Sequence, residues 1–312
     1  MIKVFIDGSH GTTGLKLREK LNNRKEIIIL EIPEKVRKDK SARKEFINSS
    51  DITFLCLPDD GAREAVEIAD FNKVRIIDAS TAHRTCDGWV YGLPELDGEF
   101  REKIKSANKV AVPGCHASGF AAIVYPLIKH KVISSDYPLV CHSLTGYSGG
   151  GKGMIEEYKA KDRGKLLSYP RQYGLNQEHK HLKEMKHICS LSDFPLFNPI
   201  VADFYSGMEV TVPLYSKLCN GMNAQDVHNV LKEHYKNQKM IKVEEFSEGA
   251  ERGFLSAGLM AERDDMKILV YGNEGRMVVS AVFDNLGKGA SGAAIQCMNI
   301  MLGLKEDMGL KV

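Results

Sequence analysis

The sequence lacks the features of disulfide-rich, membrane-spanning and strongly charged proteins. Its seven cysteines are odd in number, lie at least 26 positions apart and never form Cys-x-x-Cys, which argues against a disulfide framework or a zinc ribbon. No run approaches the roughly 18 apolar residues of a membrane-spanning helix. The 43 Lys and Arg nearly balance the 41 Asp and Glu, so no global field favours nucleic acid or an anionic membrane. We therefore expect a reducing compartment and a small-molecule partner, with no nucleic-acid or membrane partner.

The chain also shows no signal or transit segment before the strand-like run from Ile2 to Ile6. We expect a cytoplasmic protein. With 312 residues, of which 43% are hydrophobic, the chain can bury a large core and suits two domains of about 150 residues each.

The first third of the chain alternates short, continuous apolar runs with helical stretches. The runs cover residues 2–6, 27–32, 52–57, 75–78 and 109–112. Continuous apolar strands separated by helices are typical of parallel strands covered on both faces. The pattern predicts an α/β fold with a Rossmann-type, doubly wound parallel sheet.

The pattern changes after a helix that we expect to begin at about Ala117 and to include Ile128. Candidate strands follow at residues 139–144, 208–214, 267–271 and 277–282, several of them separated by long intervals without helical signals. This spacing predicts a second α+β domain with a mixed, largely antiparallel sheet. We expect the last helix, residues 290–302, to pack back on the first domain. The predicted division is 1–114 plus 286–312 for dinucleotide binding and 115–285 for catalysis, substrate binding and oligomerisation.

Three glycines form a turn between the first predicted strand and the first predicted helix. Gly8, Gly11 and Gly14 follow the strand at Gly-x-x-Gly-x-x-Gly spacing, and Thr12 and Thr13 add hydroxyl donors. Glycine permits a tight turn and lets backbone N–H groups approach a pyrophosphate, which the positive end of a helix then favours. The alternative interpretation is a turn that only connects strand to helix. We adopt the dinucleotide interpretation because of the position of the turn.

The residues after the second predicted strand bear on the form of the dinucleotide. Glu31 suits a free ribose 2′-hydroxyl, whereas Lys35, Arg37 and Lys38 suit a 2′-phosphate. The carboxylate favours NAD and the cations favour NADP, so the sequence leaves the choice between the two cofactors open.

Cys115 stands where a predicted strand passes through Pro113 and Gly114 into a helix. A helix N-terminus stabilises a thiolate through its oriented N–H groups, and the thiolate is the nucleophilic form. Most cysteines are inert buried hydrophobes, and we assign that role to Cys56, Cys141, Cys189, Cys219 and Cys297, leaving Cys86 ambiguous. The strand-turn-helix setting makes Cys115 the candidate nucleophile.

A candidate acid and base for this thiol lies in the run from Gln177 to Glu184. It contains His179 and His181, and Glu184 follows His181 by three positions, so it could orient that ring if a helix begins there. A zinc fragment and a solvated histidine pair are the alternatives, the former without support from paired cysteines. We predict no metal site.

A second glycine-rich segment runs from Ser148 through Gly149 to Lys152. Its backbone N–H groups could form a nest for an anionic group of the substrate, with the Lys152 ammonium as added charge. The same composition fits a flexible loop.

Seven segments in order carry a resemblance over nearly the whole chain. They are residues 7–14 (DGSHGTTG), 56–60 (CLPDD), 78–84 (DASTAHR), 91–96 (YGLPEL), 113–116 (PGCH), 146–152 (GYSGGGK) and 284–292 (DNLGKGASG). Together they resemble the N-acetyl-gamma-glutamyl-phosphate reductases, of the shorter of two types.

The resemblance implies an activity and an architecture. The reaction would be the NADPH-dependent reduction of N-acetyl-5-glutamyl phosphate to N-acetylglutamate 5-semialdehyde and phosphate, through a cysteine thioester, in arginine biosynthesis. The fold would join a Rossmann domain to a glyceraldehyde-3-phosphate-dehydrogenase-like domain, and the assembly would be a homodimer or homotetramer.

The resemblance also implies roles for individual residues. Cys115 matches the nucleophile, and His179, His181 and Glu184 match a His-x-His-x-x-Glu segment in which Lys183 replaces a proline of the longer type; which histidine acts stays open. The remaining implied roles are cofactor binding by Leu57, Pro58, Ser80, Asn285 and Gly289, the last two near the nicotinamide, and a carboxylate clamp at Arg84. A surface ion pair is the alternative for Arg84.

Three rival functions remain open from the sequence. A reductase of the same design could act on aspartyl phosphate or N-acetyl-aminoadipyl phosphate, because specificity depends on pocket contacts rather than fold. A nucleotide-sensing protein without catalysis could keep the glycine turn. A cysteine hydrolase could use the same thiol.

Overall fold

The computed structural model describes residues 1–312 and divides them into two compact units. Unit 1 consists of residues 1–113 and 290–310, and unit 2 of residues 114–289 and 311–312. The chain therefore leaves unit 1 directly before the turn that carries Cys115. The functions assigned from the sequence to the two parts of the chain stay predictions.

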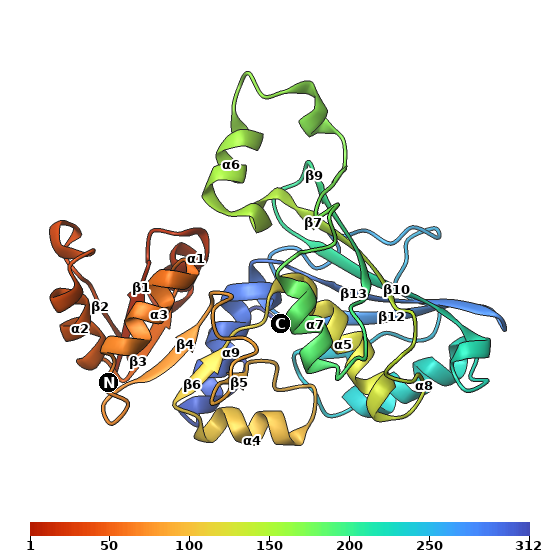
Figure 1. Ribbon diagram of the computed structural model, residues 1–312, viewed down its shortest axis with the longest axis horizontal. Helices are drawn as coiled ribbons and strands as arrows, with labels where there is room; N and C mark the ends of the chain where they lie inside the picture. Colours follow the sequence, from red (N-terminus) through yellow and green to blue (C-terminus); the bar gives the residue numbers. More distant parts are fainter. The chain divides into compact units, whose positions relative to one another are not determined.

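Unit 1 contains a six-stranded sheet in which all neighbouring strands run parallel (Figure 1). The strand order is β2-β1-β3-β4-β6-β5. The strands are β1 (Ile2–Asp7), β2 (Ile27–Leu30), β3 (Ile52–Leu55), β4 (Arg75–Asp78), β5 (Val90–Tyr91) and β6 (Lys109–Ala111). The continuous apolar run of β3 is buried along its whole length, as expected for a strand covered on both faces.

Helices cover both faces of this sheet. They are α1 (Thr12–Leu21), α2 (Lys40–Asn48), α3 (Asp59–Ile68), α4 (Gly98–Ser106) and α9 (Gly292–Met301), with a 3-10 turn η1 (Glu34–Val36). Val4 and Ile6 of β1 pack in one apolar cluster with residues of α1, α4 and α9, whereas Phe5 packs in another with residues of α2 and α3. The period of two along β1 thus separates two cores. The predicted Rossmann-type fold is confirmed, as is the return of the last helix to this unit.

Unit 2 contains a seven-stranded mixed sheet with the order β11-β12-β13-β10-β7-β9-β8. Its strands are β7 (Val140–Gly146), β8 (Arg171–Gln172), β9 (Leu196–Ala202), β10 (Met208–Tyr215), β11 (Ile241–Val243), β12 (Met266–Gly272) and β13 (Arg276–Phe283). Only β11 with β12 and β7 with β9 run parallel, which confirms the predicted mixed, largely antiparallel sheet.

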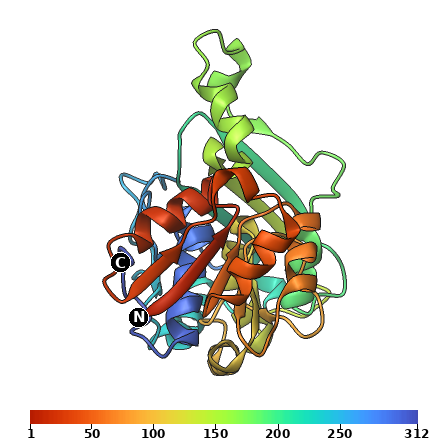
Figure 2. The ribbon, with the colours of Figure 1, turned by 90° about the vertical axis from the view of Figure 1, so that its left-hand side faces the viewer.

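The helices of unit 2 are α5 (Cys115–Lys129), α6 (Gly151–Lys159), α7 (His181–Ile188) and α8 (Ala224–Tyr235). Shorter turns are η2 (Tyr147–Gly150), η3 (Lys165–Ser168), η4 (Ser216–Leu218) and the π-helical η5 (Gly287–Ser291). Helix α5 packs on the sheet, because a Cβ on Gly119 would lie 2.6 Å from the Val210 side chain of β10. The segment with α6 and η3 extends away from this sheet in both views (Figures 1 and 2).

The structure of unit 2 differs from the sequence interpretation in three respects. The intervals without helical signals contain α6, α7 and α8, of which only a helix from His181 was considered; α8 begins at a capping box of Asn223 and Asp226, a local signal that the apolar pattern alone misses. Strand β9 was missed because Pro199 interrupts its apolar run. Helix α5 begins at Cys115 rather than near Ala117, so the thiol lies in the first helical turn.

Candidate active site

The glycine turn of unit 1 lies at the carboxyl end of β1. Gly8 has a φ of 89°, and a Cβ there would overlap the Cys56 carbonyl oxygen. A Cβ on Gly14 would overlap the Gly8 carbonyl oxygen, so helix α1 can approach the turn only without a side chain at this position. Gly11 caps α1 in an extended conformation with no side-chain cap. The first turn of α1 therefore presents backbone N–H groups at a sheet edge suited to a pyrophosphate.

Other predicted cofactor residues of unit 1 follow neighbouring strands at the same edge. Thr12 and Thr13 open α1, and Leu57 and Pro58 connect β3 to α3. Ser80 follows β4, where its hydroxyl donates to the Asp78 carboxylate at 2.7 Å. Because β1, β3 and β4 are adjacent and parallel, these residues share one edge of the sheet.

A cavity of about 160 Å³ lies beside the ends of β1 and β2, and it is lined by residues that include Ser9, His10, Arg18 and Glu31. The Arg18 guanidinium donates to the Glu31 carboxylate. Arg37 and Lys38 are absent from this lining, and Arg37 instead pairs with Glu34 at 2.6 Å. Arg18, the arginine that lines this cavity, was not predicted from the sequence. The position of Arg18 four residues after Gly14, one helical turn onward, is the signal that could have identified it.

Cys115 is the first residue of α5 and is half-buried. The Gly114 N–H, which precedes it, donates to Glu184 Oε1 at 2.8 Å. A Cβ on Gly289 would lie 2.9 Å from the Cys115 Cβ, so the backbone of η5 packs directly against the thiol side chain. Cys115 is thus fixed from two sides at a helix N-terminus, the setting that favours a thiolate.

The two predicted histidines lie together near the start of α7. The rings of His179 and His181 are 4.7 Å apart, and both pack around His116 with centroid distances of 5.7 and 5.3 Å. His181 begins α7 and is buried, whereas His179 is half-buried. Since His116 is the chain neighbour of Cys115, the structure brings both histidines into the region of the thiol.

Glu184 lies on the same turn of α7 as His181, as expected for a helix that begins at His181. Its Oε1 accepts the Gly114 N–H, so this buried carboxylate holds the turn that carries Cys115. An orienting role of Glu184 toward His181 stays a prediction.

A buried, hydrogen-bonded chain of polar side chains around His116 was not predicted from the sequence. His116 Nδ1 lies 2.6 Å from Ser143 Oγ of β7, and His116 Nε2 lies 2.6 Å from the Tyr173 hydroxyl. Burial, followed by the positive charge that His179 can carry, lowers the pKa of His116 to about 3. Ser143 and Tyr173 are remote from Cys115 in the chain, and only the adjacency of His116 to Cys115 gave a signal.

The predicted anion segment is divided between two environments. Ser148 is buried and accepts from Asn285 Nδ2 at 2.9 Å, while Asn285 Oδ1 accepts the Gly207 N–H at 3.0 Å. A Cβ on Gly149 would lie 3.5 Å from that same Asn285 amide nitrogen. Lys152 is exposed on α6 and pairs with Glu156 at 3.8 Å. The structure therefore groups Ser148, Gly149 and Asn285 and leaves Lys152 on the surface.

Arg84 follows β4 and is half-buried. Its Nε donates to the Val112 carbonyl oxygen at 2.9 Å, and its Nη2 donates to the Ala79 carbonyl oxygen at 3.3 Å. The guanidinium thus joins the ends of β4 and β6. Neither of these contacts is the surface ion pair considered as the alternative.

Several other cysteines have the burial expected of inert thiols. Burial raises the pKa of Cys141 and Cys189, raises the pKa of Cys219 to about 11, and raises the pKa of Cys56, where Asp78 and Asp7 add to the effect. Cys56 and Cys115 are both half-buried, but Cys115 differs from all the other cysteines in standing at the first residue of a helix. Cys86 is exposed.

No group of three or more His, Cys, Asp or Glu side chains is arranged to hold a metal ion. No helix among residues 1–312 combines the length and the apolar character needed to cross a membrane.

Two family models match the chain: the semialdehyde dehydrogenase NAD binding domain over residues 4–107 and the semialdehyde dehydrogenase dimerisation domain over residues 115–285. N-acetyl-gamma-glutamyl-phosphate reductase 2 of Nostoc sp. is 43% identical over 99% of both chains. N-acetyl-gamma-glutamyl-phosphate reductase 2 of Pseudomonas putida is 41% identical over 98% of both chains.

The chain is also similar to solved structures. Aspartate semialdehyde dehydrogenase II from Vibrio cholerae, complexed with ASA, has a TM-score of 0.71 at 15% identity, covering 97% of this chain and 98% of that chain. Aspartate semialdehyde dehydrogenase with NADP from Candida albicans has a TM-score of 0.67 at 14% identity, covering 99% of this chain and 100% of that chain. At these identities the likeness shows the fold alone.

Proposed function

Since this chain belongs to the N-acetyl-gamma-glutamyl-phosphate reductase family, we propose that it reduces N-acetyl-5-glutamyl phosphate with NADPH to N-acetylglutamate 5-semialdehyde and phosphate, in arginine biosynthesis. The observation that carries the proposal is Cys115, a half-buried thiol at the first residue of α5 beside a cluster of histidine rings. The proposed setting is the cytoplasm, with no nucleic-acid partner.

The reaction uses the Cys115 sulfur as the nucleophile. The thiolate attacks the acyl carbon, the carbon–oxygen bond to phosphate breaks, and a thioester remains on Cys115. When bound, NADPH supplies the hydride that reduces the thioester. The resulting thiohemiacetal gains a proton on its oxygen, and loss of that proton with cleavage of the carbon–sulfur bond releases the aldehyde and regenerates the thiolate.

His181 is our first choice for the proton transfers, with His179 as the alternative. His181 is fixed at the start of α7 and lies in the same ring cluster as His116. A general acid and base needs a fixed position within hydrogen-bond reach of the reacting oxygen.

The residues of unit 1 fit a dinucleotide. Side chains at positions 8 and 14 would overlap the backbone of the turn between β1 and α1. Their absence at Gly8 and Gly14 is the steric condition for close approach of a pyrophosphate. The predicted residues Thr12, Thr13, Leu57, Pro58 and Ser80 lie along the same edge of the sheet. For the 2′-phosphate we add Arg18, which lines the cavity beside β2, to the predicted Arg37 and Lys38.

The substrate's anionic groups need separate partners. We propose Ser148 and Gly149, with Lys152 as added charge, for the phosphate, and Arg84 for the carboxylate. Arg84 is half-buried where β4 and β6 end, and a guanidinium is suited to bidentate binding of a carboxylate. Asn285 and Gly289 stay proposed contacts of the nicotinamide half of the cofactor.

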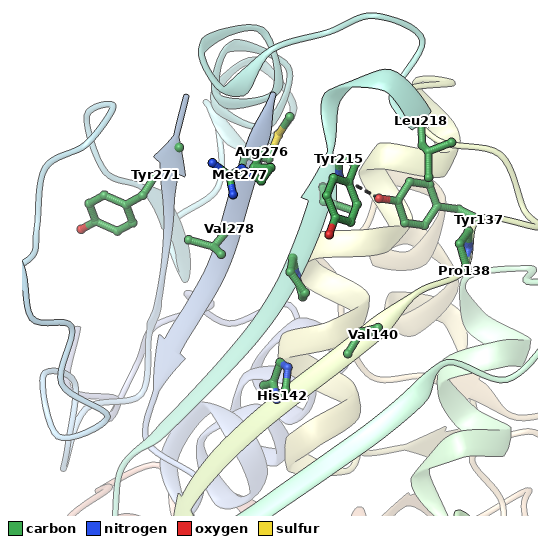
Figure 3. Close-up of a pocket in the computed structure, with 13 residues that line it drawn as sticks. Tyr137, Pro138, Val140, His142, Tyr215, Leu218, Tyr271, Arg276, Met277 and Val278 are labelled. Atoms are coloured by element: carbon green, nitrogen blue, oxygen red, sulfur yellow. Dashed lines mark hydrogen bonds between the residues drawn. The ribbon is translucent and has the colours of Figure 1, made fainter. Parts of the chain in front are cut away.

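We propose a homodimer or homotetramer in which unit 2 pairs through one face of its sheet. On β10, Val210 faces α5, so Pro213 and Tyr215 lie on the opposite side by the alternation of the strand. There, they line a cavity of about 610 Å³ together with Val140 and Val278 (Figure 3). Tyr215 is 53% exposed and Val278 is 38% exposed, so two large hydrophobic side chains on this face of the sheet are open to a partner.

The assembly is tested by analytical ultracentrifugation of the wild type and of Val278→Asp, whose carboxylate would be buried at the proposed interface. We expect the wild type to sediment as a dimer or larger and the variant to dissociate at the same concentration. A wild type that sediments as a monomer at micromolar concentration would rule out this assembly.

The activity is tested by phosphate- and NADP-dependent oxidation of N-acetylglutamate semialdehyde, followed by nicotinamide absorbance. Aspartate semialdehyde and N-acetylaminoadipate semialdehyde are assayed in parallel. We expect clear preference for the N-acetylglutamate compound. Preference for either of the others would show that the substrate is wrong, and bound NADPH without turnover of any would favour a sensor. Ester or peptide cleavage without nicotinamide oxidation would favour a cysteine hydrolase.

A further inference from the structure

A hydrogen-bonded chain of three polar side chains includes His116, the residue that follows the nucleophile on α5. Ser143 of β7, His116 of α5 and Tyr173, which follows β8, are joined by two contacts of 2.6 Å, one at each ring nitrogen of His116. Ser143 is fully buried and His116 is 3% exposed. Buried polar groups that satisfy one another in this way fix each other's positions.

The two hydrogen bonds between Ser143, His116 and Tyr173 run in one direction, because His116 is neutral. Burial lowers its pKa to about 3, so at neutral pH one ring nitrogen donates and the other accepts. Either Tyr173 donates inward toward Ser143, or Ser143 donates to Nδ1 and Nε2–H donates outward to the Tyr173 oxygen. In the second arrangement the phenol proton is available to another acceptor.

The Tyr173 hydroxyl lies 2.6 Å from the ring of His116, the chain neighbour of Cys115, so we consider the reacting centre as that acceptor. Burial and the nearby Cys115 raise the pKa of Tyr173, which keeps the phenol protonated. A negative sulfur or a negative oxygen on the bound acyl group therefore favours the outward arrangement, because it brings a phenol O–H toward the charge. Other titratable side chains come from the elements around Cys115, namely His179, His181 and Glu184 at α7 and Lys288 beside Gly289 in η5.

We propose that the Tyr173 hydroxyl donates a hydrogen bond to the negative charge that develops at Cys115 and its acyl group, and that His116 and Ser143 position this hydroxyl. Tyr173 is thus a further catalytic residue, and His116 and Ser143 are positioning residues. The inference rests on the proposed function, because it assigns the phenol to the thiolate and thiohemiacetal of that reaction.

The test compares Tyr173→Phe with the wild type in two assays. The first is phosphate-dependent oxidation of N-acetylglutamate semialdehyde, where we expect kcat to fall about 10- to 100-fold, with a much smaller change in KM. The second is the pH profile of iodoacetamide alkylation, read by mass spectrometry on the peptide that contains Cys115. We expect its midpoint to rise by about one pH unit, because the lost hydrogen bond stabilised the thiolate.

Tyr235→Phe is the matched control. The Tyr235 hydroxyl also donates to an acceptor on α5, the Ala122 carbonyl oxygen at 2.8 Å, but it lies two helical turns from Cys115. We expect this variant to keep the wild-type kcat and alkylation midpoint. If Tyr173→Phe behaves like the control in both assays, the proposal is wrong.

Two substitutions of His116 test the positioning role. The amide of His116→Gln can reach the position of Nε2 and donate to Tyr173, whereas the shorter His116→Asn can reach only the position of Nδ1. We expect the Gln variant to retain much more kcat than the Asn variant. Equal losses in folded Gln and Asn variants would contradict the assigned bond at Nε2. A wild type that turns over none of the three semialdehydes would instead reject the proposed function, independently of Tyr173.

Discussion

The glycine turn of unit 1 and the surroundings of Cys115 in unit 2 are assembled in opposite ways. The turn itself occupies residues 8–14, and backbone atoms alone, those of Gly8 and Ser9 around Gly14 and that of Cys56 around Gly8, leave no space for a side chain. The thiol site draws on α5, β7, α7 and η5, which are remote from one another in the chain. Backbone sterics determine the first site, and the packing of side chains from several segments determines the second. Changes to the two sites should therefore have separable effects.

The largest expected effect separates chemistry from cofactor binding. Cys115→Ser should lower kcat by at least about 10⁴-fold, because a serine hydroxyl is a far poorer nucleophile at neutral pH. NADPH binding, measured by fluorescence titration, should stay within about twofold of the wild type, since the glycine turn belongs to unit 1. Substantial residual turnover would show that another group attacks the substrate.

A substitution in the glycine turn should instead weaken cofactor binding. Gly8→Ala forces a side chain into the Cys56 carbonyl at a φ of 89°, so we expect a loss of at least about 1–3 kcal/mol in stability and weaker NADPH binding. Thermal unfolding with and without NADPH measures both effects. Gly98→Ala is the matched control, because a Cβ at Gly98 meets nothing within 4 Å. If both variants melt like the wild type, the turn is not sterically constrained.

The buried histidine of unit 2 gives a pH-dependent effect of intermediate size. The folded pKa of His116, about 3, lies below that of an unfolded histidine, so the unfolded chain binds a proton that the folded chain excludes. Stability is therefore unaffected above pH 6.5 and falls as the pH drops from there toward 3, by about 1.4 kcal/mol at pH 5.5.

Urea unfolding at pH 7.5 and pH 5.5 measures this effect. His116→Gln should show a smaller loss of stability between the two pH values than the wild type, by about the same 1.4 kcal/mol. Equal losses in the two proteins would mean that His116 is not the group responsible.

The smallest expected effect concerns the exposed lysine of α6. Lys152→Ala should leave the melting temperature unchanged and raise the KM for phosphate up to about fivefold, because an exposed charge contributes at most about 1 kcal/mol. Glu156→Gln is the control, since it removes the partner of Lys152 and keeps the ammonium. An unchanged KM in Lys152→Ala would remove this lysine from the phosphate site.

The success of sequence-based prediction follows the same division. The parallel sheet, the position of the glycine turn and the helix after Cys115 depend on local patterns, and the structure contains all three. Strand β9 was not predicted because Pro199 interrupts its apolar run. The contacts of Tyr173 and Ser143 with His116 were also missed, since no local pattern specifies a pair of residues brought together by a sheet.

Charge patterns were less informative than spacing. Arg37 and Lys38 were chosen because they follow the second strand, but the cavity beside that strand is lined by Arg18, which enters from α1. Glu184 was singled out by its spacing from His181, whereas the partner seen in the structure, the Gly114 N–H that donates to its Oε1, lies on another segment. Spacing identifies a residue on a helix face, whereas its partner depends on the packing of that face.

Helix α7 carries His181 and Glu184 on one turn, and Glu184 accepts a hydrogen bond from the Gly114 N–H, directly before Cys115. The position of α7 therefore bears on both partners of the proposed reaction, because the same helix carries the imidazole and holds the backbone that precedes the thiol.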